Sequence, residues 1–123
     1  MTDFSELARA VSEFAKEREW EPFHSPKNLA MALAVEVAEL LEHFQWLREQ
    51  ESFELGEERL QAVAYEIADV QIYLMRLAER LGVDILAATA AKLEINRARD
   101  PVEKCRGSAQ KHTAHADSGS NDA

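Results

Sequence analysis

Two pairs of acidic residues stand out because each pair is spaced three positions apart within an apolar segment. Glu36 and Glu39 are the two polar residues of the segment 29–41, and all of its remaining residues are apolar. Glu66 and Asp69 repeat the same spacing further along the chain. In an α-helix, positions three apart are separated by about 60° around the axis, so both members of a pair occupy one face. Two helices are therefore predicted to carry two carboxylates each.

The helical wheel places both pairs on the faces that should be buried. Four leucines lie within about 60° of Glu36, namely Leu29, Leu33, Leu40 and Leu47. The neighbours of Glu66 on its wheel are mostly apolar as well, namely Ala62, Val63, Val70, Tyr73 and Leu77. The opposite faces carry polar residues, which are Lys27, Glu42, Gln45 and Glu49 in the first segment and Glu57, Gln61, Gln71 and Glu79 in the second. The four carboxylates are thus expected to point inward.

A buried group of four carboxylates needs compensation by cations. An unpaired buried carboxylate is costly or shifts its pKa until it is neutral. No nearby lysine or arginine has the helical phase to pair with all four. Oxygen ligands of this number suit a hard divalent ion, so the pattern predicts Mg²⁺, with Mn²⁺ as an alternative, before zinc. The competing interpretation is two solvated acidic faces, which is the usual meaning of a single pair of this kind.

Four helices can be predicted from apolar periodicity and end signals. The first begins at a cap on Thr2 or Asp3 and stops before Pro22, the second runs from Pro26 to about Gln50, the third from Glu57 to Leu81, and the fourth from a cap at Asp84 to a stop before Pro101. A short loop is expected over 51–56. These elements predict an all-α, four-helix bundle over residues 1–102, followed by a flexible or disordered tail over 103–123. Because the core is small and contains acids, a homodimer or homotetramer is expected.

Composition limits the classes of protein that fit. The chain has 123 residues, of which 46% are hydrophobic and 30% charged, as in a soluble globular domain. The absence of a long apolar run and of a signal-peptide pattern, together with the single Cys105, leads us to expect a cytoplasmic location and no membrane contact. A net charge of −9 argues against binding a nucleic-acid polymer, but a single nucleotide that arrives with metal is compatible with it.

Further residues have two possible interpretations each. Trp20, Phe23, Trp46 and Tyr73 form either a stacking pocket for a base or ordinary core and interface contacts. His24, in a proline-rich loop, either hydrogen-bonds a substrate or lies exposed. Three residues share one stripe of the predicted fourth helix, where they either contact phosphates or face solvent: Lys92, Asn96 and Arg99.

Several segments resemble the MazG-like all-α nucleoside triphosphate pyrophosphohydrolases, with the closest likeness to the dCTP pyrophosphatase branch. They are Glu-Arg-Glu-Trp-Glu-Pro-Phe-His-Ser-Pro-Lys-Asn-Leu at 17–29, Glu36-Val-Ala-Glu39, Phe44-Gln-Trp46, Glu66-Ile-Ala-Asp69 with Ile72-Tyr-Leu74, and Lys92 with Asn96-Arg97. The likeness extends to about Thr113. The segment 106–113 has His112 where the family pattern has tyrosine, so a lid role for it is not supported.

The resemblance implies an Mg²⁺-dependent hydrolysis of a nucleoside triphosphate to the monophosphate and pyrophosphate, with dCTP or a modified dCTP as substrate. It implies that the four acids bind the metal and that Glu36 or Glu39 activates water. It further implies that Trp20, His24 and Trp46 surround the base, and that Lys92 and Asn96 contact phosphates.

Three alternatives remain open. One is a pyrophosphatase of broad nucleotide specificity. Another is a di-iron carboxylate bundle, which needs Glu-x-x-His motifs on helices, whereas the single match here, Glu21 with His24, is interrupted by proline. The third is a non-enzymatic helical interaction module, which leaves the inward acids unexplained.

Overall fold

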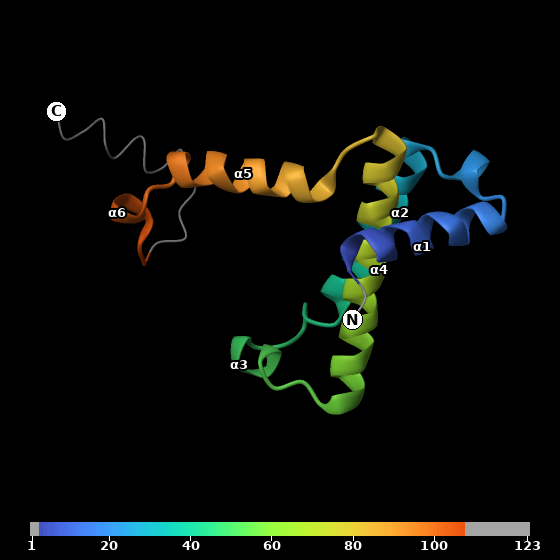
Figure 1. Ribbon diagram of the computed structural model, residues 1–123. Coiled ribbons are helices and arrows are strands. Elements are labelled where there is room, and N and C mark those ends of the chain that lie inside the picture. Colours follow the sequence, from blue (N-terminus) through green and yellow to red (C-terminus); the bar gives the residue numbers. More distant parts are fainter. Residues whose placement is uncertain (1–2, 108–123) are drawn as a thin grey trace. The chain divides into compact units, whose positions relative to one another are not determined.

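The computed structural model describes residues 3–107, and within that range all regular secondary structure is helical (Figure 1). The all-α prediction is therefore confirmed for this part of the chain. The chain divides into two compact units, Met1–Val83 and Asp84–Ala123. Each unit is described by itself below. None of the helices between residues 3 and 107 is both long and apolar enough to cross a membrane.

The first helix, α1 (Phe4–Glu17), begins as its sequence signals predict but ends earlier. The side chain of Asp3 accepts a hydrogen bond from the backbone N–H of Glu6 at 2.8 Å, which caps the helix. At the other end Glu19 adopts a positive φ of 53°, and the N–H of Trp20 bonds to the carbonyl of Ala15 at 3.0 Å. This left-handed closure turns the chain back, so that the rings of Trp20 and Phe14 lie 5.6 Å apart in an edge-to-face arrangement.

A single 3₁₀ turn, η1 (Glu21–Phe23), leads into α2 (Pro26–Glu42). The hydroxyl of Ser25 accepts a hydrogen bond from the N–H of Asn28, and Pro26 occupies the first turn, as predicted. The prediction that this helix continues to about Gln50 is wrong. Turns follow its end at Glu42, and a new short helix, α3 (Glu49–Ser52), occupies part of the expected loop. The carboxylate of Glu51 caps α3 by accepting from the backbone N–H of Arg48 at 2.9 Å.

The longest helix, α4 (Glu57–Leu81), has the predicted bounds and packs against both α2 and α1. Gly82 terminates it with a positive φ of 68°, while the N–H of Val83 bonds to the carbonyl of Ala78 at 2.8 Å. Leu29 and Val63, both on the predicted inward faces, are 1% and 5% exposed. Met75 is also buried, although it lies on the opposite side of α4 from Val63 and Glu66, because α1 covers part of this helix.

The second unit contains α5 (Ile85–Arg99) and the short helix α6 (Val102–Cys105). Asp84 caps α5 by accepting from the N–H of Ala87 at 3.0 Å, as predicted. Helix α6 overlaps the start of the segment 103–123, and the flexibility or disorder predicted for that segment stays a prediction. Residues 108–123 lie outside the described residues.

Candidate functional site

Three of the four predicted carboxylates meet where α2 packs on α4. Glu36 and Glu39 come from α2 and Glu66 from α4, and one carboxylate oxygen of each lies within 4.8 Å of the others. Glu36 and Glu66 are half-buried, whereas Glu39 is exposed. The pairing of α2 with α4 thus gathers side chains that are about thirty positions apart in the sequence into one cluster.

The cluster is electrostatically incomplete. One oxygen of Glu36 and one of Glu66 are buried without a hydrogen-bond partner among residues 3–107. The pKa of Glu36 is raised by its side-chain contact with Glu66, then by burial and the charge of Glu66. The pKa of Glu39 is raised as well, chiefly by the charge of Glu36. Buried acceptors without donors, crowded by like charge, fit a bound hard cation.

The fourth acid, Asp69, lies beside this cluster rather than within the group of three. Its charge adds to the raised pKa of Glu36. It also contributes, after burial and the charge of Glu36, to the raised pKa of the Tyr73 phenol. In addition, Asp69 lines the neighbouring cavity, so it connects the carboxylates to the space beside them.

That cavity has a volume of about 240 Å³ and is mostly apolar. Its lining comes from α1, the 3₁₀ turn region and α4: Val11, Phe14, Ala15, Trp20, His24, Asp69, Ile72, Tyr73 and Arg76. The rings of Trp20 and His24 lie 5.7 Å apart at its wall. Three residues that the sequence indicated for substrate binding, Trp20, His24 and Tyr73, are therefore brought together beside the acids.

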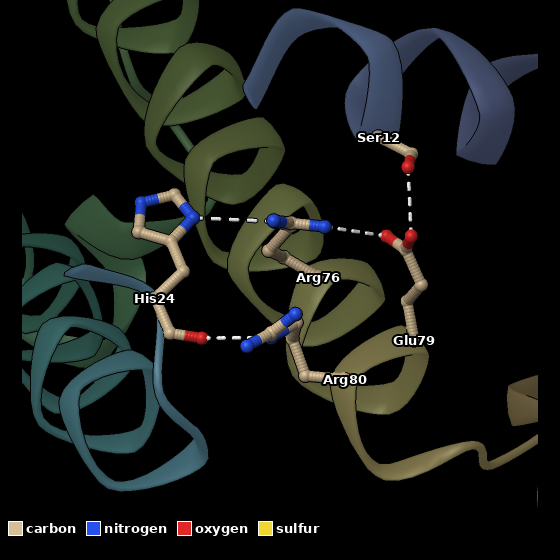
Figure 2. Close-up of polar contacts among 5 residues, drawn as sticks. All are labelled: Ser12, His24, Arg76, Glu79 and Arg80. Carbon is tan, nitrogen blue, oxygen red and sulfur yellow. Dashed lines mark hydrogen bonds and ion pairs between the residues drawn. The ribbon is translucent and has the colours of Figure 1, made fainter. Parts of the chain in front are cut away.

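A polar network includes two residues of the cavity wall, His24 and Arg76. Figure 2 shows its contacts. Nε of Arg76 donates to Nδ1 of His24 at 3.2 Å, and Nη1 of Arg76 pairs with Glu79 at 2.8 Å. The hydroxyl of Ser12 on α1 donates to the same carboxylate at 2.7 Å. Arg80 donates through Nε to the backbone carbonyl of His24 at 3.1 Å. The network fixes the histidine to α4 through both its ring and its backbone.

Comparison with known proteins places these features in a family. The family model described as MazG-like matches residues 31–113, which include the whole of the acid cluster. The chain belongs to the MazG-like family.

Several relatives of this MazG-like protein are named as pyrophosphatases. It is 45% identical over 110 residues to dCTP pyrophosphatase 1 of Homo sapiens and 46% identical to that of Mus musculus. Each match covers 88% of this chain but 65% of the relative, so the chain spans slightly less than two thirds of these proteins. A solved pyrophosphatase of Archaeoglobus fulgidus is 42% identical, with a TM-score of 0.77, and the match covers 82% of this chain and 94% of that one.

Other predicted site residues of the MazG-like protein are not in the cavity wall. Trp46 follows the end of α2, is 86% exposed and does not line the cavity. Lys92 and Asn96 line a groove along α5 in the second unit, and Arg99 pairs with the adjacent Asp100 at 3.3 Å. His112 lies outside the described residues. The roles of these residues in binding remain predictions.

The apolar and acidic patterns did not single out Arg76, although it is only 2% exposed. It is the sole charged residue between Val70 and Ala78, in a run that is otherwise mainly apolar. A single arginine within such a run is the signal in the sequence that would have indicated a buried cation, because arginine is seldom fully buried unless it is paired.

Metal-free protein should become more stable when the cluster loses one charge. Because the pKa of Glu36 is raised, the folded state binds its proton more tightly than the unfolded state, whose ordinary value is 4.5. Stability should therefore fall as pH rises from that value through the folded pKa. Glu36→Gln should abolish most of this fall and raise the melting temperature at neutral pH in chelator.

Calorimetry in chelator and in Mg²⁺ checks this expectation. Mg²⁺ should raise the melting temperature of the wild type but have little effect on Glu36→Gln, since ligands stabilise the state they bind. Glu13→Gln, an exposed acid on α1, serves as the control and should behave like the wild type. Equal Mg²⁺ stabilisation of all three proteins would contradict a metal site in this cluster.

Proposed function

We propose that the chain is an Mg²⁺-dependent nucleotide pyrophosphohydrolase that converts dCTP, or a modified dCTP, to the monophosphate and pyrophosphate. The main observation behind this proposal is the cluster of three carboxylates with buried, unpartnered oxygens directly beside a small aromatic cavity. The names of the relatives, which are pyrophosphatases, support the same class of reaction.

The carboxylates are proposed to hold the metal and to activate water. Glu36, Glu39 and Glu66 would be ligands through the oxygens that converge, with Asp69 as a fourth from the cavity side. Bound Mg²⁺ would neutralise charge on the α-phosphate and on the leaving pyrophosphate. A carboxylate not fully engaged by metal, Glu36 or Glu39, would orient the attacking water and accept its proton. The raised pKa of both groups in the metal-free protein is compatible with proton transfer at such a position.

The cavity is proposed to bind the base. Its volume of about 240 Å³ lies below the range of about 300–1,000 Å³ for ligand pockets, which favours a pyrimidine over a larger purine. Trp20 offers an aromatic face, and His24 and Tyr73 add polar atoms to an otherwise apolar wall. Base recognition and metal binding would then occur on adjoining parts of α4, with Asp69 between them.

The outer phosphates are proposed to contact the stripe on α5. Lys92 and Asn96 share one groove of that helix. Arg99 is proposed as a third contact. An ammonium, an amide and a guanidinium are groups that commonly donate hydrogen bonds to phosphate.

Assembly into a homodimer or homotetramer, built from four-helix bundles of the MazG-like type, is part of the same proposal. Many large apolar side chains of α2 and α4 are more than half exposed, including Met31, Val35, Leu41, Leu60, Tyr65 and Ile67. Large apolar side chains exposed in this number suit an interaction surface. A second copy of the chain is the proposed partner, because it would supply a matching apolar surface.

The bond that breaks can be identified with dCTP in ¹⁸O-labelled water. Attack of water at the α-phosphorus should place the label in dCMP and leave pyrophosphate unlabelled, because pyrophosphate is then the leaving group. Mass spectrometry of the products measures this directly. Orthophosphate as the first product would contradict the proposed reaction, and similar rates for all nucleoside triphosphates would show a pyrophosphatase of broad specificity.

Removal of the cavity tryptophan should impair binding of the base specifically. Trp20→Ala should raise KM for dCTP by roughly 5- to 150-fold, because stacking on an aromatic ring contributes about 1–3 kcal/mol per base. KM for inorganic triphosphate, which has no base, should change little. Equal losses on both substrates would mean that Trp20 supports only the fold.

The same measurement tests Trp46, whose role is implied by resemblance alone. Trp46→Ala should give a base-dependent loss if this exposed ring reaches the nucleotide. Phe53→Ala is the matched control, because Phe53 is 82% exposed and also lies outside the cavity. Indistinguishable kinetics for the two variants would remove Trp46 from the binding site.

Sedimentation equilibrium should give a mass of two or four times the 13.9 kDa of the chain. Leu60→Lys should weaken the assembly, because it places a charge on a side chain that is 56% exposed and apolar. Gln61→Lys makes the same charge change at the neighbouring exposed polar position and should have little effect. A monomeric wild type at micromolar concentration would contradict the proposed assembly.

A further inference from the structure

Arg76 is a buried cation whose contacts are only partly those of a structural ion pair. Its side chain is 2% exposed, and Nη1 forms the ion pair with Glu79. Nη2 is buried without a hydrogen-bond partner among residues 3–107. A buried arginine kept only for stability would be expected to satisfy its donors, because an unpartnered buried donor is costly. The distinctive contact of Arg76 is the one from Nε to the ring of His24 at the cavity wall.

The chemistry of this contact determines where the histidine carries its proton. An arginine guanidinium stays protonated in proteins and donates hydrogen bonds without accepting any. Nδ1 of His24 must therefore accept, which requires a lone pair on that nitrogen. The neutral ring then carries its proton on Nε2. Burial and the nearby charges of Arg76 and Arg80 lower the pKa of His24, so the neutral ring is favoured independently.

The ring is also held in place. Figure 2 shows the second ring nitrogen of His24 on the side of the ring away from Arg76, and among residues 3–107 it has no hydrogen-bond partner. Arg76 is oriented by Glu79, and Glu79 is in turn oriented by Ser12 from α1. Arg80 fixes the backbone carbonyl of the histidine. Nε2–H is thus a donor of fixed polarity on a ring that lines the cavity.

We propose that Arg76 is a positioning residue that locks His24 in the Nε2–H tautomer, so that the cavity selects ligands that present a hydrogen-bond acceptor to this donor. The selection of a nucleobase rests on the proposed function, whereas the tautomer does not. A pyrimidine supplies such an acceptor through its ring carbonyl at C2, and a cytosine also through N3. An edge that offers an N–H group at this place would meet a second donor and be rejected, since the site cannot reverse its polarity.

The tautomer can be measured on the free protein by ¹⁵N NMR. The chain has four histidines, and His24→Ala identifies the signals of this ring. The wild type near neutral pH should show an unprotonated Nδ1 and a protonated Nε2. Arg76→Met should give averaged signals of both tautomers, because the donor at Nδ1 is lost. Arg80→Met removes an arginine that contacts only the backbone carbonyl and should preserve the wild-type pattern.

The outcomes against the proposal are equally clear. A wild-type ring with its proton on Nδ1, or on both nitrogens, would overturn the proposal without any variant. Unchanged signals in Arg76→Met would show that the arginine does not set the tautomer. If Arg76→Met does not fold, the wild-type signals decide alone, because a proton on Nδ1 of His24 contradicts the proposal without any variant.

A double-mutant cycle connects the tautomer to selection. His24→Ala should raise KM for dCTP by about 3- to 10-fold, as expected for the loss of one hydrogen bond. Arg76→Met should raise KM similarly with little change in kcat, and the double variant should be no worse than His24→Ala alone. Additive losses would mean that Arg76 acts independently of His24. Absence of any dCTP hydrolysis in the wild type would contradict the proposed function and leave the NMR result to decide the role of Arg76.

Discussion

Mutual repulsion among carboxylates is the constraint on which the arrangement of this protein depends. The packing of α2 on α4 places Glu36 and Glu66 on half-buried faces, where water no longer separates their charges effectively. The same packing buries Leu29, two turns from Glu36, and Val63, one turn from Glu66. These apolar contacts stabilise the pairing of α2 with α4, which the repulsion among the acids opposes. A bound hard cation would relieve this repulsion, which is why the proposed metal site is placed at this cluster.

The helix ends show how much of the fold could be predicted from short-range chemistry. Asp3, Ser25, Asp84 and Gly82 terminate helices as their residue types indicate, because caps satisfy backbone groups within a few positions. The end of α2 could not be predicted in this way. No glycine or proline lies between Glu42 and Arg48. The early end of α2 reflects a competing cap, formed by Arg48 and Glu51, that starts α3.

A single helical wheel was sufficient to predict which acids share a helix face, whereas their role as a functional site stays a prediction. The inward phase of Glu36 and Glu66 follows from the leucines and valines that share their faces, and the structure brings them together with Glu39. A wheel cannot show that α4 is covered by α1 as well as by α2. For that reason Met75 and Arg76 were not expected to be buried, and the network that reaches His24 was not foreseen.

Trp46 shows a second limit of reasoning from the sequence. On an extended second helix it would share the apolar environment of its neighbours, but the helix ends before it and leaves the ring exposed. Motif resemblance carries residue identity over without the backbone that positions the side chain. Trp20 differs because a left-handed turn at Glu19 returns it to α1, where Phe14 meets its ring.

The polar network of Ser12, Glu79, Arg76 and His24 limits what could be transferred to another protein by exchanging a loop. The loop between α1 and α2 contains Trp20 and His24, the residues that contribute most visibly to the cavity wall. However, the groups that orient His24 belong to other elements, namely α1 and the end of α4. A graft of that loop onto another helical scaffold would transfer both aromatic rings without transferring the proton arrangement of the imidazole. If His24 selects the ligand as proposed, the preference would depend jointly on three segments, and recombination of loops alone would not exchange it.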